Sequence, residues 1–111
     1  MKQKILLKGI TASIGRVRGR AKIVSFPEEI EDLKETEIVV VSFPAPLFLH
    51  AIKRNSQILG MISDKGGLTC HAAIVARELG IPYIAGTGSA TKILKDGMVI
   101  TIDGKDGIVY G

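Results

Sequence analysis

Short runs rich in β-branched residues constrain the fold of this chain most strongly. Each run is bounded by glycine, proline, aspartate or charged residues, which is typical of β-strands. The predicted strands are Gly19–Phe26, Glu37–Phe43, Gln57–Ser63, Pro82–Ala85, Met98–Asp103 and Gly107–Tyr110. The turn-rich stretch between the last two, DGKDG, predicts an antiparallel hairpin at the C-terminal end.

Helical segments separate several of these strands. Pro46–Arg54 and Cys70–Leu79 have helical character, and Ser89–Leu94 is predicted to form a short helix capped by Ser89. Strands that alternate with helices along the chain indicate an α/β fold with a mixed sheet and short helices. A chain of 111 residues, 46% of them hydrophobic, has the size of one domain, so residues 1–111 are expected to form a single domain.

The composition argues against several classes of protein. Fifteen Lys and Arg against eleven Asp and Glu give a formal charge of +4, and only 5% of residues are aromatic, so no nucleic-acid partner is expected. The first apolar run, Ile5–Leu7, is too short for a secretory signal, and no run approaches the roughly 20 residues of a membrane span. The single cysteine, Cys70, excludes an internal disulfide. We therefore expect a cytoplasmic protein without a membrane partner.

The segment GGLTCHAAIVAR places one of only two histidines at the start of a predicted helix. Thr69 is a favoured N-cap residue, Gly80 stands where a left-handed C-terminal residue belongs, and Pro82 prevents continuation. The sequence therefore predicts a helix over Cys70–Leu79, with His71 in its first turn.

A histidine in the first turn of a helix has chemical consequences. Backbone N–H groups and the positive end of the helix dipole favour an anion beside the imidazole. The same field disfavours imidazolium, which helps to keep a ring nitrogen available as a nucleophile near neutral pH. Gly66 and Gly67 would let the backbone come close to an incoming phosphate. Spacing alone leaves a second interpretation open, in which the glycines only form a strand-to-helix turn and His71 is an ordinary surface residue.

Other chemistries have little support in the sequence. A metal site is not expected, because His50 and His71 are far apart and no paired Cys/His spacing exists. A serine or cysteine hydrolase would need a GxSxG motif, or a base that faces its nucleophile, and neither is present. Gly86-Thr87-Gly88 lacks the third glycine of a dinucleotide-binding loop.

The residues from Gly66 to Thr91, GGLTCHAAIVARELGIPYIAGTGSAT, resemble the phosphohistidine, or swivelling, domain of phosphoenolpyruvate-utilising enzymes. This family includes phosphoenolpyruvate synthase (pyruvate, water dikinase), pyruvate phosphate dikinase and enzyme I of the sugar phosphotransferase system, and the Cys-His pair looks most like the synthase branch. The resemblance extends through Gly9–Gly15 and Lys95–Gly104, and it implies a single swivelling β/β/α domain. One departure is Ile14, where many members have proline.

The resemblance also implies roles for individual residues. His71 would be phosphorylated transiently on Nε2, and Thr69 would orient the ring or the phosphoryl group. Gly66-Gly67 would shape the loop that the phosphate approaches. Cys70 and Arg77 match the motif as possible supporting residues. We interpret Cys70 as a packing residue and Arg77, six positions beyond His71, as a member of a structural ion pair.

In full-length relatives the histidine shuttles between an ATP-grasp nucleotide-binding domain and a TIM barrel that binds phosphoenolpyruvate or pyruvate. The present chain has no P-loop, no carboxylate cluster suited to Mg²⁺ and no room for a barrel, so we expect no cofactor on this domain, and Mg²⁺ with ATP or phosphoenolpyruvate on partner domains or chains. The prediction is a phosphotransferase component that is not catalytically complete on its own. The alternative is a non-catalytic regulatory or interaction module that kept the swivelling fold and binds a phosphorylated ligand or partner.

Two charged segments complete the sequence-based expectations. The acidic stretch Glu28–Glu35 is predicted to be a solvated connection. Alternation places four basic side chains on one strand face, where they are either a surface that steers partners or the protected edge of a solvated strand. These residues are Arg16, Arg18, Arg20 and Lys22.

Overall fold

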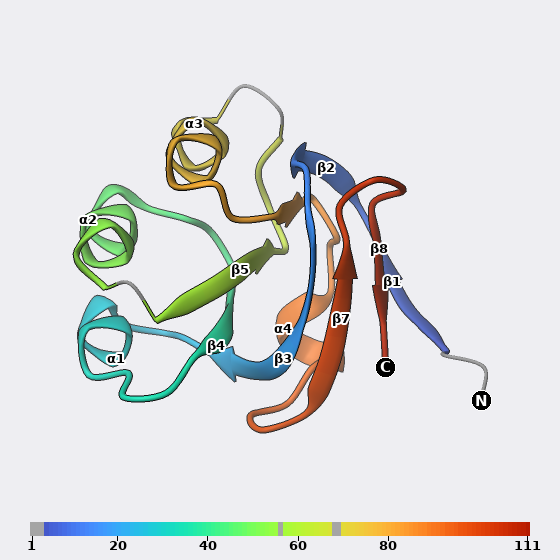
Figure 1. Cartoon of the computed structure of the whole chain (residues 1–111), viewed down its shortest axis with the longest axis horizontal. Coiled ribbons are helices and arrows are strands. Elements are labelled where there is room, and N and C mark those ends of the chain that lie inside the picture. The colour runs from blue at the N-terminus through green and yellow to red at the C-terminus, as the bar shows by residue number, and fades with distance from the viewer. Residues whose placement is uncertain (1–3, 56, 68–69) are drawn as a thin grey trace.

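Eight strands form one mixed sheet in the computed structural model, which describes residues 4–55, 57–67 and 70–111 (Figure 1). The strands are β1 (Ile5–Lys8), β2 (Ile10–Ser13), β3 (Arg16–Ile23), β4 (Glu37–Val41), β5 (Ile58–Ser63), β6 (Tyr83–Ala85), β7 (Val99–Asp103) and β8 (Ile108–Tyr110). Their order across the sheet is β1-β8-β7-β3-β4-β5-β6-β2. Strands β3 to β6 are parallel, and the other pairings, including the predicted β7–β8 hairpin, are antiparallel. The expected α/β fold with a mixed sheet is confirmed.

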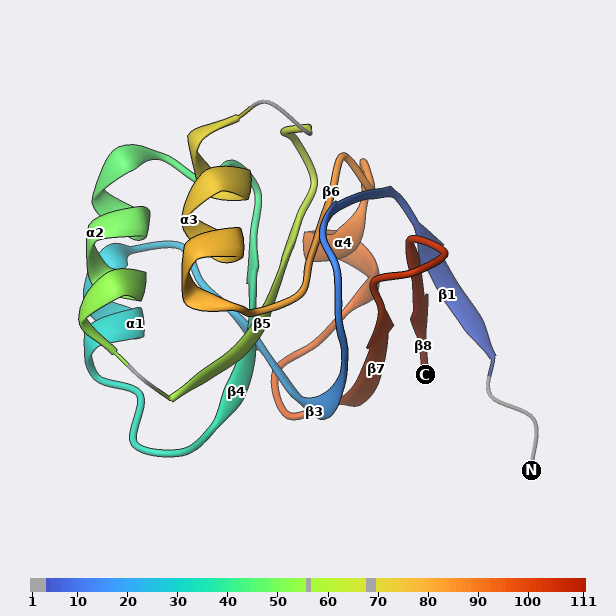
Figure 2. The same ribbon diagram turned by 45° about the horizontal axis from the view of Figure 1, so that its top comes forward.

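The two outermost strands of the sheet belong to one chain segment. β1 pairs with β8, β2 pairs with β6, and only Gly9 separates β1 from β2. A Cβ atom on Gly9 would lie 2.5 Å from the carbonyl oxygen of Ala85, and the Gly9 N–H donates to the carbonyl of Gly107 at 2.8 Å. Figures 1 and 2 show the segment running continuously from one end of the sheet to the other. No strand was predicted here, because Lys8 and Gly9 interrupt the apolar pattern.

Helices cover the sheet on both faces. The described residues form α1 (Pro27–Glu31), α2 (Pro46–Arg54), α3 (His71–Leu79) and α4 (Ala90–Ile93). Figure 1 shows α1, α2 and α3 on one side of the sheet and α4 on the other. In β4, Val39 and Val41 pack in the core under α1–α3, whereas Ile38 and Val40 pack in the core that includes α4. Burial of both faces explains the unbroken apolar run in this strand. None of these helices is long and apolar enough to cross a membrane.

The acidic stretch is solvated as predicted at most of its charged residues, but it is not simply a connection, because it contains most of α1. Ile30 of α1 is 0% exposed and packs in the core under α1–α3. The Glu29 carboxylate accepts hydrogen bonds from the backbone N–H groups of Ser25 and Phe26, both at 2.9 Å, and this closes the turn that begins α1. The helix has only five residues and one buried side chain, so the sequence contains no repeated apolar pattern from which it could have been recognised.

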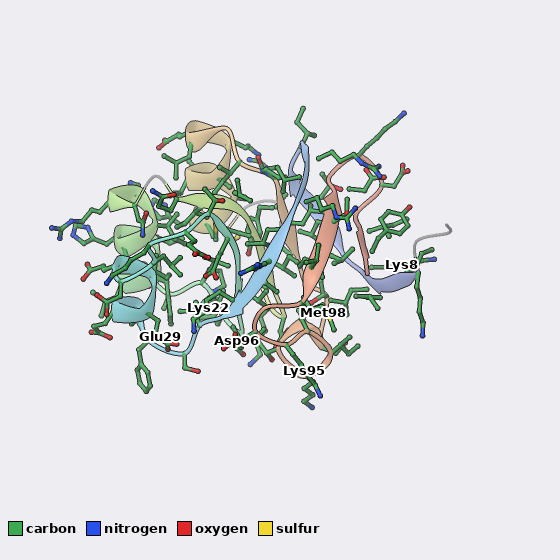
Figure 3. All side chains as sticks on the ribbon, turned by 60° about the horizontal axis from the view of Figure 1, so that its bottom comes forward. Lys8, Lys22, Glu29, Lys95, Asp96 and Met98 are labelled. Atoms are coloured by element: carbon green, nitrogen blue, oxygen red, sulfur yellow. The ribbon has the colours of Figure 1, made fainter. Side chains whose placement is uncertain are left out.

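The basic row lies on a central strand, so its interpretation as a solvated strand edge is wrong. β3 is flanked by β7 and β4. Three of its four cations lie near carboxylates: Arg16 at 3.4 Å from Asp103, Arg20 at 3.7 Å from Glu35, and Lys22 at 3.5 Å from Asp96. Figure 3 shows Lys22 and Asp96 side by side. Within the described part of the chain only Arg18 of this row has no ion pair, so the row has little net charge with which to steer a partner.

The burial of Ile30 gives a test of the α1 assignment. Replacing Ile30 with alanine should lower the free energy of unfolding by about 2–5 kcal/mol, because a large side chain is removed from a packed core. Urea unfolding followed by circular dichroism measures this change. Glu31→Ala, at an exposed position of the same helix, is the matched control and should stay within about 0.5 kcal/mol of the parent. Equal effects of the two substitutions would contradict the packing of α1.

Candidate functional site

His71 is the first residue of α3, and its side chain is exposed. The predicted position in the first helical turn is therefore confirmed. The N-cap residue is Cys70, with extended backbone angles, and not Thr69 as predicted, because the helix begins one residue later than expected. Thr69 itself lies outside the described residues. The helix ends as predicted at Gly80, whose φ of +70° is left-handed.

The start of α3 is suited to hold an anion. The geometry of an α-helix leaves the backbone N–H groups of His71 and Ala72 without acceptors inside the helix, and the helix dipole adds partial positive charge at this end. Small and β-branched side chains, those of Ala72, Ala73, Val75 and Ala76, bury one side of α3 in the core. The exposed imidazole therefore stands on a helix whose position is fixed by packing.

The two glycines before α3 have different structural roles. Gly66 has a φ of +117°, in the region that favours glycine, and a Cβ atom there would lie 3.0 Å from the hydroxyl oxygen of Tyr83. Gly67 has no positive φ, and a Cβ atom there would have no described atom within 4 Å. Gly66 is therefore required by the conformation of the loop, whereas a side chain at Gly67 would meet no described atom.

A buried polar cluster lies beneath Gly66. The hydroxyl groups of Ser63, at the end of β5, and Tyr83, at the start of β6, are 2.6 Å apart, and both residues are 0% exposed. The Ser63 hydroxyl donates to the Lys65 carbonyl at 2.5 Å, and the Cys70 thiol donates to the Gly67 carbonyl at 3.0 Å. Cys70 thus closes the turn that leads into α3, a more specific role than the packing that the sequence predicted.

Asp64 connects the same loop to the other side of the sheet. Its carboxylate accepts hydrogen bonds from the backbone N–H of Thr91 at 3.0 Å and from the Thr91 hydroxyl. Ser89 is the N-cap residue of α4 as predicted, but its side chain makes no capping hydrogen bond, and the Asp64 carboxylate binds this end of the helix instead. Backbone N–H groups of Thr87 and Gly88 donate to the carbonyls of Ser63 and Asp64. The loop after β6 therefore holds the first part of the loop after β5.

Arg77 connects α3 to the segment that bridges the sheet. Its Nε donates to the carbonyl oxygen of Ala12, in β2, at 2.8 Å. This contact joins two elements of the fold, in keeping with a structural role, and its acceptor is a backbone carbonyl. Arg77 therefore helps to fix the C-terminal half of α3 against β2.

The sequence analysis missed Ser63, Asp64 and Tyr83. Ser63 and Asp64 follow directly on a buried strand, and a polar pair at the carboxyl end of a parallel strand is a recognisable indication of a site in α/β folds. No pattern marked Tyr83, since a tyrosine in an apolar strand is ordinary. Its role depends on a partner 20 positions away in the sequence.

The described residues do not offer a metal centre. No group of three or more His, Cys, Asp or Glu side chains lies close enough to hold a metal ion in the parts of the chain that the structure describes.

Residues 33–107 match the family model described as "PEP-utilising enzyme, mobile domain". The match covers more than half of the chain, and the chain belongs to this family. A probable phosphoenolpyruvate synthase from Archaeoglobus fulgidus is 50% identical over 107 residues, which are 96% of this chain and 14% of that protein. The chain thus spans only a small part of the length of such relatives.

Two solved structures resemble the fold. A solution structure of Enzyme I is 38% identical in sequence with a TM-score of 0.65, and the match covers 72% of this chain and 32% of that chain. A crystal structure of aconitase X from Thermococcus kodakaraensis has a TM-score of 0.69 at 20% identity, over 94% of this chain and 95% of that chain. The second likeness concerns the fold alone, so function must be argued from the site.

The two glycines provide a matched pair of substitutions. Gly66→Ala should lower the free energy of unfolding by about 1–3 kcal/mol, because the backbone angle is unfavourable for alanine and the new Cβ would meet the Tyr83 hydroxyl. Gly67→Ala, one residue further on, should change stability by no more than about 0.5 kcal/mol. Guanidinium unfolding of both variants measures the difference. If Gly66→Ala were as stable as Gly67→Ala, the loop would not have the conformation described.

Proposed function

We propose that this domain is a phosphoryl carrier in which His71 is phosphorylated transiently. One observation carries the proposal: an exposed histidine begins α3, beside a glycine loop and N–H groups that have no acceptor inside the helix, in a chain of the mobile-domain family. An imidazole is a good nucleophile toward phosphorus when one ring nitrogen is unprotonated, and the helix N-terminus favours the negative charge that arrives with the phosphate.

The transfer needs little covalent chemistry from this chain. The lone pair of the His71 Nε2 atom attacks the phosphorus of a phosphate donor, an N–P bond forms, and the P–O bond to the leaving group breaks. In the second step an acceptor oxygen attacks the same phosphorus and the N–P bond breaks, which restores the imidazole. Backbone N–H groups at the start of α3 would hold the phosphoryl oxygens. Thr69 is proposed to orient the ring or these oxygens.

Donor and acceptor sites would lie on other domains or chains. The relatives are several times longer than this chain, which is 14% of the Archaeoglobus protein. We propose that an ATP-grasp-like domain supplies the nucleotide site, and a TIM barrel the site for pyruvate or phosphoenolpyruvate. Mg²⁺ and ATP or phosphoenolpyruvate would be held there, where the metal would neutralise phosphate charge. This domain would carry the phosphoryl group between the two sites.

The two ends of the domain lie together, and this supports such a movement. The backbone N–H of Gly111 donates to the carbonyl of Lys4 at 2.8 Å, and β1 and the C-terminal end lie on the opposite side of the molecule from α3 (Figures 1 and 2). In a longer polypeptide, both connections to the domain would leave from neighbouring points. Two linkers attached at one place would allow the domain to rotate about that point as one body. His71, on the opposite side, would then move through the largest distance.

Replacing His71 with alanine should abolish phosphorylation without loss of the fold. The domain is incubated with ATP or phosphoenolpyruvate, Mg²⁺ and a lysate of the source cells, and intact mass is measured at alkaline pH and again after acid treatment. The parent should gain one phosphoryl group that acid removes, and His71→Ala should gain none.

His50→Ala is the matched control, since His50 is the other histidine and lies exposed on α2. It should be phosphorylated like the parent. An acid-labile label retained by His71→Ala would overturn the assignment. If no donor labels the parent at all, the alternative of a non-catalytic module that binds a phosphorylated ligand is favoured.

Thr69 can be tested separately from helix capping. Since Cys70 is the N-cap residue, Thr69→Ala should leave stability within about 0.5 kcal/mol of the parent, and yet slow phosphoryl transfer by about tenfold through the loss of one hydrogen bond. Thr69→Ser retains the hydroxyl group and should transfer at nearly the parent rate. Rapid-quench measurement of phosphohistidine formation distinguishes the variants, and equal rates for alanine and serine would remove Thr69 from the mechanism.

A further inference from the structure

Tyr83 is an unusual residue for the core in which it lies. It occupies β6, is 0% exposed, and packs among apolar side chains of the core under α1–α3. Its hydroxyl group is nevertheless hydrogen-bonded, at 2.6 Å from the Ser63 hydroxyl. A buried hydroxyl without a partner would be costly, so the position of the Ser63–Tyr83 pair is well determined.

Counting protons assigns the direction of each hydrogen bond. The Ser63 hydroxyl has one proton, and it donates that proton to the Lys65 carbonyl. The Ser63 oxygen must therefore accept from Tyr83, which acts as the donor. Burial raises the pKa of the Tyr83 hydroxyl well above its usual range, so Tyr83 keeps this proton at every physiological pH.

The Tyr83 hydroxyl also lies directly beneath the turn that leads to His71. A Cβ atom built on Gly66 would be 3.0 Å from the Tyr83 hydroxyl oxygen, and 3.6 Å from both the Cys70 sulfur and the Ser63 hydroxyl oxygen. Three polar atoms, from β5, β6 and the N-cap of α3, thus surround one side of Gly66. Cys70 in turn donates to the Gly67 carbonyl and directly precedes His71.

We propose that Tyr83 is a positioning residue for His71, and that it holds Gly66 and Cys70 in place together with Ser63, so that the imidazole and the helical N–H groups face the phosphoryl donor. The inference rests on the proposed function and adds a residue to it. Asp64 and the loop after β6 hold the chain just after β5, and Tyr83 supports Gly66.

Support of this loop matters because the rate of phosphoryl transfer depends on the geometry of the reacting groups. Phosphoryl transfer needs the attacking nitrogen, the phosphorus and the leaving group in line, and a small displacement of the donors that hold the phosphoryl oxygens slows the reaction. Removing the Tyr83 hydroxyl leaves the Ser63 oxygen without its donor and leaves a gap under Gly66. The ring itself still fills the core, so the fold is retained.

The test uses phosphoramidate, a small phosphoryl donor that needs no partner protein. Nε2 of His71 attacks its phosphorus, the P–N bond of the donor breaks, and ammonia leaves. Tyr83→Phe should lower the rate of phosphohistidine formation at saturating phosphoramidate by about tenfold, in line with the loss of one buried hydrogen bond. Tyr110→Phe, at the only other tyrosine and on the distant strand β8, should react at the parent rate.

Three further readouts separate positioning from general destabilisation. Ser63→Ala should slow the reaction similarly and add nothing in the Tyr83→Phe background, because both substitutions interrupt one chain of hydrogen bonds. Amide hydrogen exchange should quicken in Tyr83→Phe at the backbone around Gly66 and Cys70, and remain unchanged in β4 and β7. The ratio of parent to variant rates should be constant from about pH 6 to about pH 9, since Tyr83 does not ionise there.

The outcomes distinguish this inference from the proposed function. If the parent forms no phosphohistidine at His71 with phosphoramidate or with a cellular donor, the carrier function fails and the inference fails with it. If the parent reacts and Tyr83→Phe reacts equally fast, only the positioning role of Tyr83 is overturned. The role is also overturned if exchange quickens equally throughout the domain, since the effect would then be global.

Discussion

The burial of β4 and β5 on both faces is the constraint on which the rest of this structure depends. Helices α1–α3 cover one face, while α4 and the curved sheet cover the other, so neither strand can shift without opening one of the two cores. The chain leaves β5 at the buried Ser63, and the loop with Gly66 starts from this fixed point. Segments remote in the sequence, β6 and the start of α4, then hold the loop through Tyr83 and Thr91. His71 is exposed and yet stands on rigid support.

The segment that contains β1 and β2 completes this support from the opposite side. It pairs with both ends of the sheet and accepts a hydrogen bond from Arg77 of α3 at the carbonyl of Ala12. Because the two chain ends meet at Lys4 and Gly111, the elements around His71 contain neither end. A domain attached on one side and reactive on the other can move as one body, which is what carriage of a phosphoryl group between separate sites would require.

Fold and site contribute separately to the proposed function. The likeness to aconitase X at 20% identity shows that this arrangement of strands and helices is not restricted to one activity. The proposed phosphoryl transfer would depend on a few atoms at the start of α3. Gly67 has no side chain to obstruct an approaching group, and Gly66 has a backbone angle that is unfavourable for other residues. Cys70 donates a hydrogen bond to the Gly67 carbonyl just before the histidine. Tyr83 and Ser63 belong to the same arrangement, although neither would touch the substrate.

The sequence by itself determined those features that depend on neighbouring residues. The helix over Pro46–Arg54, the C-terminal hairpin and the first-turn position of His71 follow from local periodicity, turn residues and the glycine that ends α3. The sequence motif around His71 also indicated the mobile-domain family. Tertiary structure alone decided that β1 and β2 bridge the sheet, that β3 is central, that Ile30 is buried, and that Cys70 occupies the N-cap position of α3. It also brought Tyr83 beneath Gly66. These features arise from pairing and packing between segments far apart in the chain, for which a single sequence contains no local pattern.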